Sequence, residues 1–164
     1  MLKINDYVIY NLIGVCKIID ITEGKDIHDV DTEYYVLQPV CNSNLIIKCP
    51  VNGPKILIRK IISKNEALSL IETIPETETV WIENNRERNA SFKAALKTGD
   101  SEEWMRLLKT LYVEKQEKSD AGKKLCKSDE DIMKTVEKNL FEEFSIALDI
   151  LPDQVSSLIE DRIS

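Results

Sequence analysis

The chain has almost none of the residues and motifs on which metal or acid–base chemistry depends. Its 164 residues include a single histidine, His28, and four cysteines, none of which belongs to a Cys-x-x-Cys pair. It contains no glycine-rich phosphate loop, no Gly-x-Ser-x-Gly turn and no His-Glu-x-x-His helix. A zinc site or a nucleophile–base pair built from His28 and a thiol is therefore disfavoured. We expect a protein that is not an enzyme, needs no metal, cofactor or small-molecule substrate, and keeps its cysteines as buried, reduced thiols.

Long apolar runs are also missing. The longest uninterrupted apolar stretches are only a few residues, whereas a helix that spans a membrane needs about 20. Residues 1–6 lack the apolar core and the small-residue cleavage site of a secretion signal. We therefore expect a cytoplasmic protein that does not contact membranes.

Charge is distributed unevenly along the chain, whose net charge is −7. Residues 81–127 carry 11 basic and 8 acidic side chains, whereas residues 128–164 carry 3 basic and 10 acidic ones. Residues 1–80 are mildly acidic, with 8 basic and 11 acidic side chains. Any contact with nucleic acid is expected in the central segment, and it should be weak because few phosphates can be neutralised.

The first sixty residues predict a β-rich domain. Segments rich in β-branched and aromatic residues alternate with turn-forming residues, and they predict strands at 7–10, 15–21, 33–40, 45–50 and 56–59. The polar segment 22–32 is expected to be a loop, and residues 51–54 a turn. Five short strands in so little sequence predict a small, strongly bent sheet or open barrel.

Helical periodicity begins at Ser63, which forms a capping box with Glu66. Further helices are predicted at about 79–97, 101–118 and 128–149 and from Pro152, with N-caps at Asp100 or Ser101 and at Ser128. Trp104 repeats at helical spacing with leucines and is expected in the core.

Residues 75–79 break the helical pattern, and we interpret them as the hinge between the domains. The predicted fold is therefore α+β: a β-rich domain at 1–62, a connecting helix and hinge at 63–78, and an all-helical bundle at 79–164.

One short segment combines a large aromatic side chain with two arginines. Trp81 lies at the expected start of a helix, and Arg86 and Arg88 follow one to two turns later. Proteins that bind the minor groove use an apolar wedge together with phosphate-binding cations in this way. A helix that buries Trp81 and leaves both arginines in solvent has the same local sequence, so both interpretations stay open.

Several segments, taken in order and at their spacing, resemble one protein family over nearly the whole chain. They lie at residues 3–10, 14–15, 33–37, 45–51, 96–100, 122–125 and 141–148. Lys3 to Tyr10 followed by Gly14-Val15 resembles the opening of the CarD/CdnL family of bacterial transcription regulators, which bind RNA polymerase.

This resemblance implies an N-terminal Tudor-like domain, a type shared with transcription-repair coupling factors, that docks on the lobe of the RNA polymerase β subunit by strand-to-strand contact. The residues that correspond to this interface are Lys25, Leu45, Ile46, Ile47 and Lys48.

The resemblance also implies that the helical domain lies on promoter DNA at the upstream edge of the melted bubble and slows its re-annealing. Trp81 would be the minor-groove wedge, although an alignment anchored on residues 98–100 places Asn85 there instead. The DNA contact would be largely independent of sequence, with phosphates bound by Arg86, Arg88, Lys93, Lys123 and Lys124. The alternative is an interaction module that binds polymerase or another partner without engaging DNA.

Overall fold

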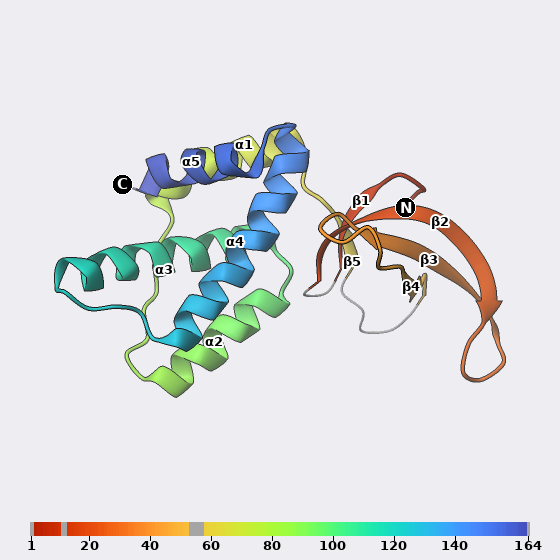
Figure 1. The fold of residues 1–164 in the computed structure, drawn as a ribbon, viewed down its shortest axis with the longest axis horizontal. Helices are drawn as coiled ribbons and strands as arrows, with labels where there is room; N and C mark the ends of the chain where they lie inside the picture. The colour runs from red at the N-terminus through yellow and green to blue at the C-terminus, as the bar shows by residue number, and fades with distance from the viewer. Residues whose placement is uncertain (1, 11–12, 53–57, 164) are drawn as a thin grey trace. The chain divides into compact units, whose positions relative to one another are not determined.

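The chain forms two compact units, one up to Ile61 and one from Ile62. A computed structural model describes residues 2–10, 13–52 and 58–163. The first unit is an antiparallel sheet and the second is helical (Figure 1). The predicted α+β fold, with the sheet first and the helices second, is confirmed. Within the described ranges no helix combines the length and the apolar character needed to cross a membrane.

The sheet has five strands in the order β4-β3-β2-β1-β5, and every neighbouring pair is antiparallel. The strands are β1 (Tyr7–Tyr10), β2 (Gly14–Lys25), β3 (Asp31–Pro39), β4 (Ile47–Pro50) and β5 (Ile58–Lys60). β4 and β5 are therefore its edge strands. Positions 56 and 57 of the predicted fifth strand, and residues 53 and 54 of the predicted turn, lie outside the described residues.

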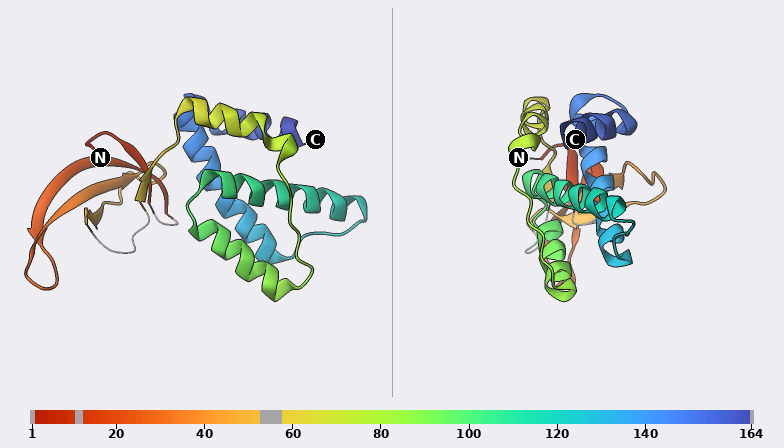
Figure 2. Two further views of the ribbon diagram at one scale, coloured as in Figure 1. Left: turned by 180° about the vertical axis from the view of Figure 1, so that it is seen from behind. Right: turned by 90° about the vertical axis from the view of Figure 1, so that its left-hand side faces the viewer.

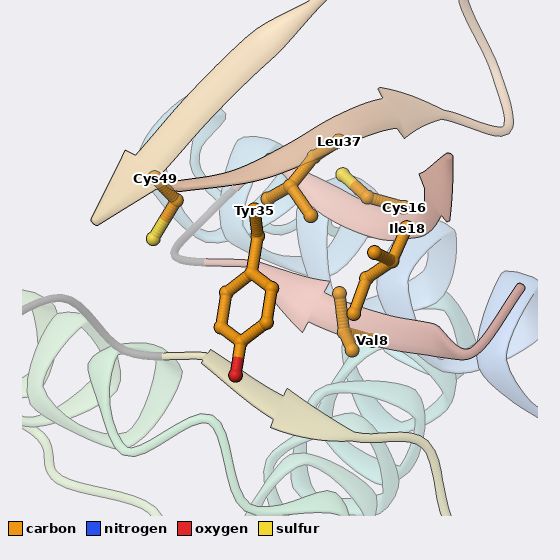
Figure 3. Packing of buried hydrophobic residues seen from close by; sticks show 6 residues of the cluster. All are labelled: Val8, Cys16, Ile18, Tyr35, Leu37 and Cys49. Atoms are coloured by element: carbon orange, nitrogen blue, oxygen red, sulfur yellow. The ribbon is translucent and has the colours of Figure 1, made fainter. Parts of the chain in front are cut away.

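One buried cluster of this unit lies on a single face of the sheet, because alternate residues of a strand share a face. The side chains of the buried cluster gather there (Figure 3), and they are Val8, Cys16, Ile18, Tyr35, Leu37 and Cys49. A register shift between Ile18 and Asp20 bends the β2–β3 pair.

The prediction of buried thiols is confirmed for two of the four cysteines and wrong for the others. Cys16 and Cys49 are buried, and burial raises the pKa of the Cys49 thiol. Cys41 and Cys126 are exposed, because one lies in the turn after β3 and the other directly before a helix.

The predicted loop at 22–32 is largely strand. β2 continues to Lys25 and β3 begins at Asp31, so the loop shrinks to residues 26–30. Polar residues form this end of the hairpin because backbone pairing and cross-strand contacts, rather than burial, stabilise it: Lys25 lies opposite Asp31, and the Tyr34 hydroxyl donates to the Lys25 carbonyl at 3.4 Å.

The second unit contains α1 (Lys64–Glu72), the short 3₁₀ helix η1 (Ile74–Glu76), α2 (Asn85–Lys97), α3 (Ser101–Asp120), α4 (Lys127–Leu148) and α5 (Pro152–Ile163). The predicted caps at Ser63 and Asp100 are confirmed, since each side chain accepts a backbone N–H of the first turn. The cap at Ser128 is wrong: α4 begins one residue earlier, with Cys126 at the N-cap position, and the Ser128 hydroxyl instead accepts a hydrogen bond from the Asn89 amide.

Residues 63–78 belong to the helical unit. α1 packs against α4 and α5 and lies beside α5 in both orientations of the ribbon (Figure 2). The segment predicted as a hinge is held by Lys109 of α3, whose ammonium donates to the carbonyls of Ile74, Pro75 and Thr77 at 2.7, 3.1 and 2.8 Å. Three charge-assisted hydrogen bonds oppose free movement of this segment.

Candidate functional site

The first candidate surface is the outer edge of β4, which pairs with no further strand among the described residues. The Val51 N–H donates to the Glu33 carbonyl at 2.9 Å, which makes these two residues a hydrogen-bonded pair of the β3–β4 ladder. Hydrogen-bonded and non-hydrogen-bonded pairs alternate in an antiparallel ladder. Lys48, opposite Val36, is then a non-hydrogen-bonded position, so its N–H and C=O point toward the open edge.

Two large apolar side chains are exposed beside this edge. Leu45 is 42% exposed and Ile46 is 49% exposed, although both lie in the approach to β4 and not in the strand. Ile47 packs against the sheet core, and the Lys48 side chain is exposed. The predicted residues 45–48 therefore form one edge that offers backbone groups, apolar side chains and a cation.

Lys25 is not a free cation beside this edge. It lies at the end of β2, and its ammonium forms ion pairs with Asp29 at 3.7 Å and with Asp31 at 3.4 Å. All three side chains are exposed, so the pairs are weak, but they offset its charge locally.

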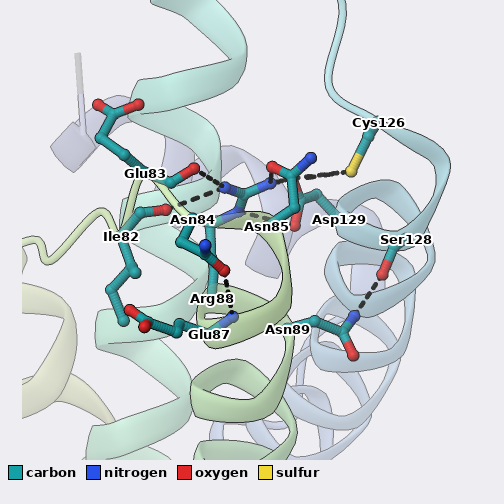
Figure 4. A network of polar contacts seen from close by, with 10 residues as sticks. All are labelled: Ile82, Glu83, Asn84, Asn85, Glu87, Arg88, Asn89, Cys126, Ser128 and Asp129. Carbon is teal, nitrogen blue, oxygen red and sulfur yellow. Dashed lines mark hydrogen bonds and ion pairs between the residues drawn. The ribbon is translucent and has the colours of Figure 1, made fainter.

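The second candidate surface is organised around a buried arginine in the helical unit. Arg88 is 4% exposed, and its Nη2 and Nε donate to the two carboxylate oxygens of Asp129 at 2.8 and 3.2 Å (Figure 4). The hydrogen bond from Asp129 raises the pKa of Arg88 above its already high value. In this structure the guanidinium is buried and hydrogen-bonded within the protein, which does not favour the predicted contact between Arg88 and phosphate; that contact stays a prediction.

The same guanidinium fixes the chain that precedes α2. Its Nη1 donates to the carbonyls of Ile82 and Glu83 at 2.9 and 3.3 Å, and its Nη2 donates to Asn85 Oδ1 at 2.8 Å. Asp129 lies in the first turn of α4, where the helix dipole favours a carboxylate. One side chain therefore joins the segment before α2, α2 itself and the start of α4.

Trp81 does not begin a helix, because α2 starts only at Asn85 with Asn84 as its N-cap. The ring of Trp81 is half-buried: the Arg88 guanidinium lies 4.2 Å from its centroid and the Phe92 ring lies 6.1 Å away. The Lys118 ammonium also lies over this ring, at 5.5 Å. These contacts give Trp81 a packing role, and its insertion into DNA stays a prediction.

The exposed face of α2 is basic. Residues spaced by four, three and four positions share one side of a helix. All four residues at this spacing are exposed, and they are Arg86, Ala90, Lys93 and Lys97. This basic face extends for about 16 Å along the helix.

A second group of cations lies before and at the start of α4. Lys123 and Lys124 are exposed in the loop before α4, and Lys127 is exposed at its first position. The hydrogen bond between Asn89 and Ser128 and the ion pair between Arg88 and Asp129 bring the start of α4 against α2. These contacts join α2, which carries Arg86 and Lys93, to the start of the helix that follows the loop with Lys123 and Lys124.

Sequence reasoning missed two of these cations. Lys97 follows Lys93 by four positions, and this spacing, which places both lysines on one side of a helix, could have identified it. Lys127 follows Lys123 and Lys124 closely in the chain, which was the signal for it, and in the structure its ammonium pairs with Asp131 at 3.9 Å. Within the described ranges, no group of three or more His, Cys, Asp and Glu side chains is placed to hold a metal ion.

Comparison with protein-family models identifies the N-terminal part of the chain. Residues 2–62, which coincide with the sheet unit, match the family described as the CarD-like/TRCF RID domain. No curated protein matches the chain significantly.

Proposed function

Because the N-terminal unit of this chain belongs to the CarD-like/TRCF RID domain family, which interacts with RNA polymerase, we propose that the protein is a transcription regulator that binds the polymerase β subunit and stabilises the promoter open complex. The sheet unit would bind the polymerase, and residues 79–164 of the helical unit would contact DNA upstream of the bubble.

The observation that carries this proposal is the free edge of β4. Strand addition needs unpaired backbone donors and acceptors, and the Lys48 N–H and C=O face the open edge. Leu45 and Ile46 offer apolar area beside it, which a partner would remove from water. The predicted role of Lys25 is weaker, because Asp29 and Asp31 already pair with it.

The proposed DNA contact is supported by the basic region on α2 and before α4. Arg86, Lys93, Lys97, Lys123 and Lys124 are exposed and would contact phosphates without reading bases. This small set of cations, in a chain of net charge −7, would give only weak affinity for free DNA.

The polymerase contact is tested with two substitutions at one position. Lys48→Gln removes the charge of the side chain and keeps the backbone N–H, whereas Lys48→Pro removes both. Proline is tolerated on a free edge, so we expect both variants to fold. Binding of purified bacterial RNA polymerase should fall several-fold for Lys48→Gln through loss of an exposed charge, and at least tenfold for Lys48→Pro.

The measurement is equilibrium binding of the core enzyme to immobilised protein, with circular dichroism as the control for folding. Equal affinities of the two variants would exclude strand addition at this position. If both variants bind the polymerase as tightly as the wild type does, the β4 edge is not part of the interface.

A further inference from the structure

The helical unit contains a cavity of about 520 Å³ between α3 and α5. These two helices contact each other, and both pack against α4. Cavities that hold small organic molecules usually measure roughly 300–1,000 Å³, so this one has room for such a ligand. Its described lining belongs to α3 and α5, is not used by the proposed polymerase and DNA contacts, and includes Tyr112, Val113, Lys115, Glu117, Glu160 and Ile163.

The aromatic wall of this cavity is tied to a carboxylate of α4. Tyr112 is half-buried, and its hydroxyl forms a hydrogen bond with Glu137. Burial raises the pKa of Tyr112 well above its usual range, so the phenol stays protonated and donates this hydrogen bond. The face of an aromatic ring attracts a cation that lies within about 6 Å of its centroid. Tyr112 therefore gives the cavity a ring, held by α4, that suits an organic cation.

Carboxylates outnumber cations around this ring. The lining includes Glu117 and Glu160, against the single lysine Lys115. Burial raises the pKa of Glu137, and the charge of Glu160 raises it further, whereas the charge of Lys115 lowers it. Glu137 and Glu160 therefore lie close enough to repel each other. A bound cation would offset the excess negative charge and relieve this repulsion.

The remaining wall suits a carbon chain better than a metal ion. Val113 and Ile163 are both half-buried and give the cavity apolar lining. A chain of CH₂ groups that packs on them is removed from water, which favours binding. Among the residues that the structure describes, no group of three or more His, Cys, Asp and Glu side chains is placed to hold a metal ion. Anions are disfavoured, because they would meet more carboxylates than cations.

We propose that this cavity binds a small organic cation, namely an alkyl ammonium or guanidinium compound. The cationic group lies between the Tyr112 ring and the Glu160 carboxylate, and the carbon chain packs on Val113 and Ile163. The compound is bound without being chemically changed. It joins α3 to α5 and so stabilises the helical unit, because a ligand that binds only the folded form favours that form. This inference goes beyond the proposed function and does not depend on it.

The test uses agmatine, a four-carbon chain with a guanidinium at one end and an ammonium at the other. Isothermal titration of the full-length protein at constant ionic strength should show one site, and agmatine should raise the thermal unfolding temperature. Glu160→Gln should weaken binding about tenfold, through loss of a charge-assisted hydrogen bond. The matched control is Asp153→Asn, because Asp153 is an exposed carboxylate of the same helix outside the described lining, and its affinity should equal that of the wild type.

A second substitution should change the affinity in the opposite direction. Lys115→Gln removes the cation of the lining that repels the ligand, so agmatine should bind several-fold more tightly. Lys115 and Glu160 are both exposed, and the unfolding temperature of each variant without agmatine is the control for folding. A purely structural role for these side chains would not produce opposite changes in affinity.

Four outcomes would overturn the inference. Absence of binding by the wild type would exclude the ligand, and unchanged affinity of Glu160→Gln would place it outside the cavity. Equal weakening by Asp153→Asn would show that agmatine is only a counterion of the acidic surface. Tighter binding of an acetylated arginine amide than of agmatine would assign the cavity to an arginine side chain of a protein partner. Polymerase is absent from these experiments, so their failure leaves the proposed function, which the Lys48 variants test, unaffected.

Discussion

At the scale of single residues, two arginines of one helix have opposite environments. Arg86 is exposed on the basic face of α2, whereas Arg88 is buried against Asp129, which is itself only 2% exposed. The guanidinium of Arg88 makes five hydrogen bonds to oxygen atoms. A planar group with several donors in fixed directions suits such a site, and lysine could not replace it.

Removal of either member of this buried pair should strongly destabilise the helical unit. We expect Asp129→Asn to lower its free energy of unfolding by about 3–5 kcal/mol, because the buried Arg88 charge would lose its counterion. Urea denaturation followed by tryptophan fluorescence measures this, since both tryptophans lie in the helical unit. The control is Arg86→Met on the same helix, which should cost no more than about 0.5 kcal/mol. Identical midpoints for Asp129→Asn and the wild type would contradict a stabilising role of the pair.

At the scale of elements, α2 separates a structural face from a basic face. Arg88, Phe92 and Leu96 are buried on one side, and the exposed cations lie on another. Such a helix can hold a fixed row of charges against a nucleic-acid backbone, because packing of its buried side sets its orientation.

The basic face should determine how the open complex responds to salt. In the double variant Lys93→Gln/Lys97→Gln we expect a shorter open-complex lifetime on a polymerase–promoter pair. The slope of its logarithm against the logarithm of salt concentration should fall by up to roughly 2, since each lost phosphate contact contributes about 0.9. Lys64→Gln on α1 is the control and should leave lifetime and slope unchanged, because Lys64 is exposed outside the basic region. A lifetime unaffected by the double variant would favour an interaction module that does not engage DNA.

At the scale of the whole molecule, each of the two units would make one of the two proposed contacts. The sheet unit would supply affinity for the polymerase, and the helical unit would supply a DNA contact too weak to act alone. Joining the two contacts in one chain raises the effective concentration of the basic region at the promoter.

This arrangement predicts that the protein prolongs the open complex only when it binds the polymerase. The protein alone should bind a promoter duplex only weakly at physiological salt, and Lys48→Pro should abolish prolongation of the open complex although every cation of α2 is intact. Open-complex lifetimes at rising protein concentration measure this. If Lys48→Pro prolongs the open complex fully only at high protein concentration, the DNA contact depends on the polymerase contact as proposed. If Lys48→Pro prolongs it as much as the wild type does at low concentration, this dependence is wrong.

Local sequence determined much of the fold. β-branched segments, the capping residues Ser63 and Asp100 and the helical spacing around Trp104 specified the order of strands and helices, because these signals depend on neighbours within one turn or one strand. Pro75 and its neighbours broke a helix as predicted, but the sequence could not show that Lys109, more than thirty residues away, holds this segment.

Tertiary structure alone decided which of the singled-out residues remain available to partners. Arg86 and Arg88 have the same local chemistry, and only the approach of α4 buries the second against Asp129. The hairpin was predicted as a loop because its polar residues lack apolar alternation, yet pairing between β2 and β3 continues through them. Burial, ion pairing and strand partners depend on residues distant in the chain, so they follow from the folded arrangement and not from the local pattern.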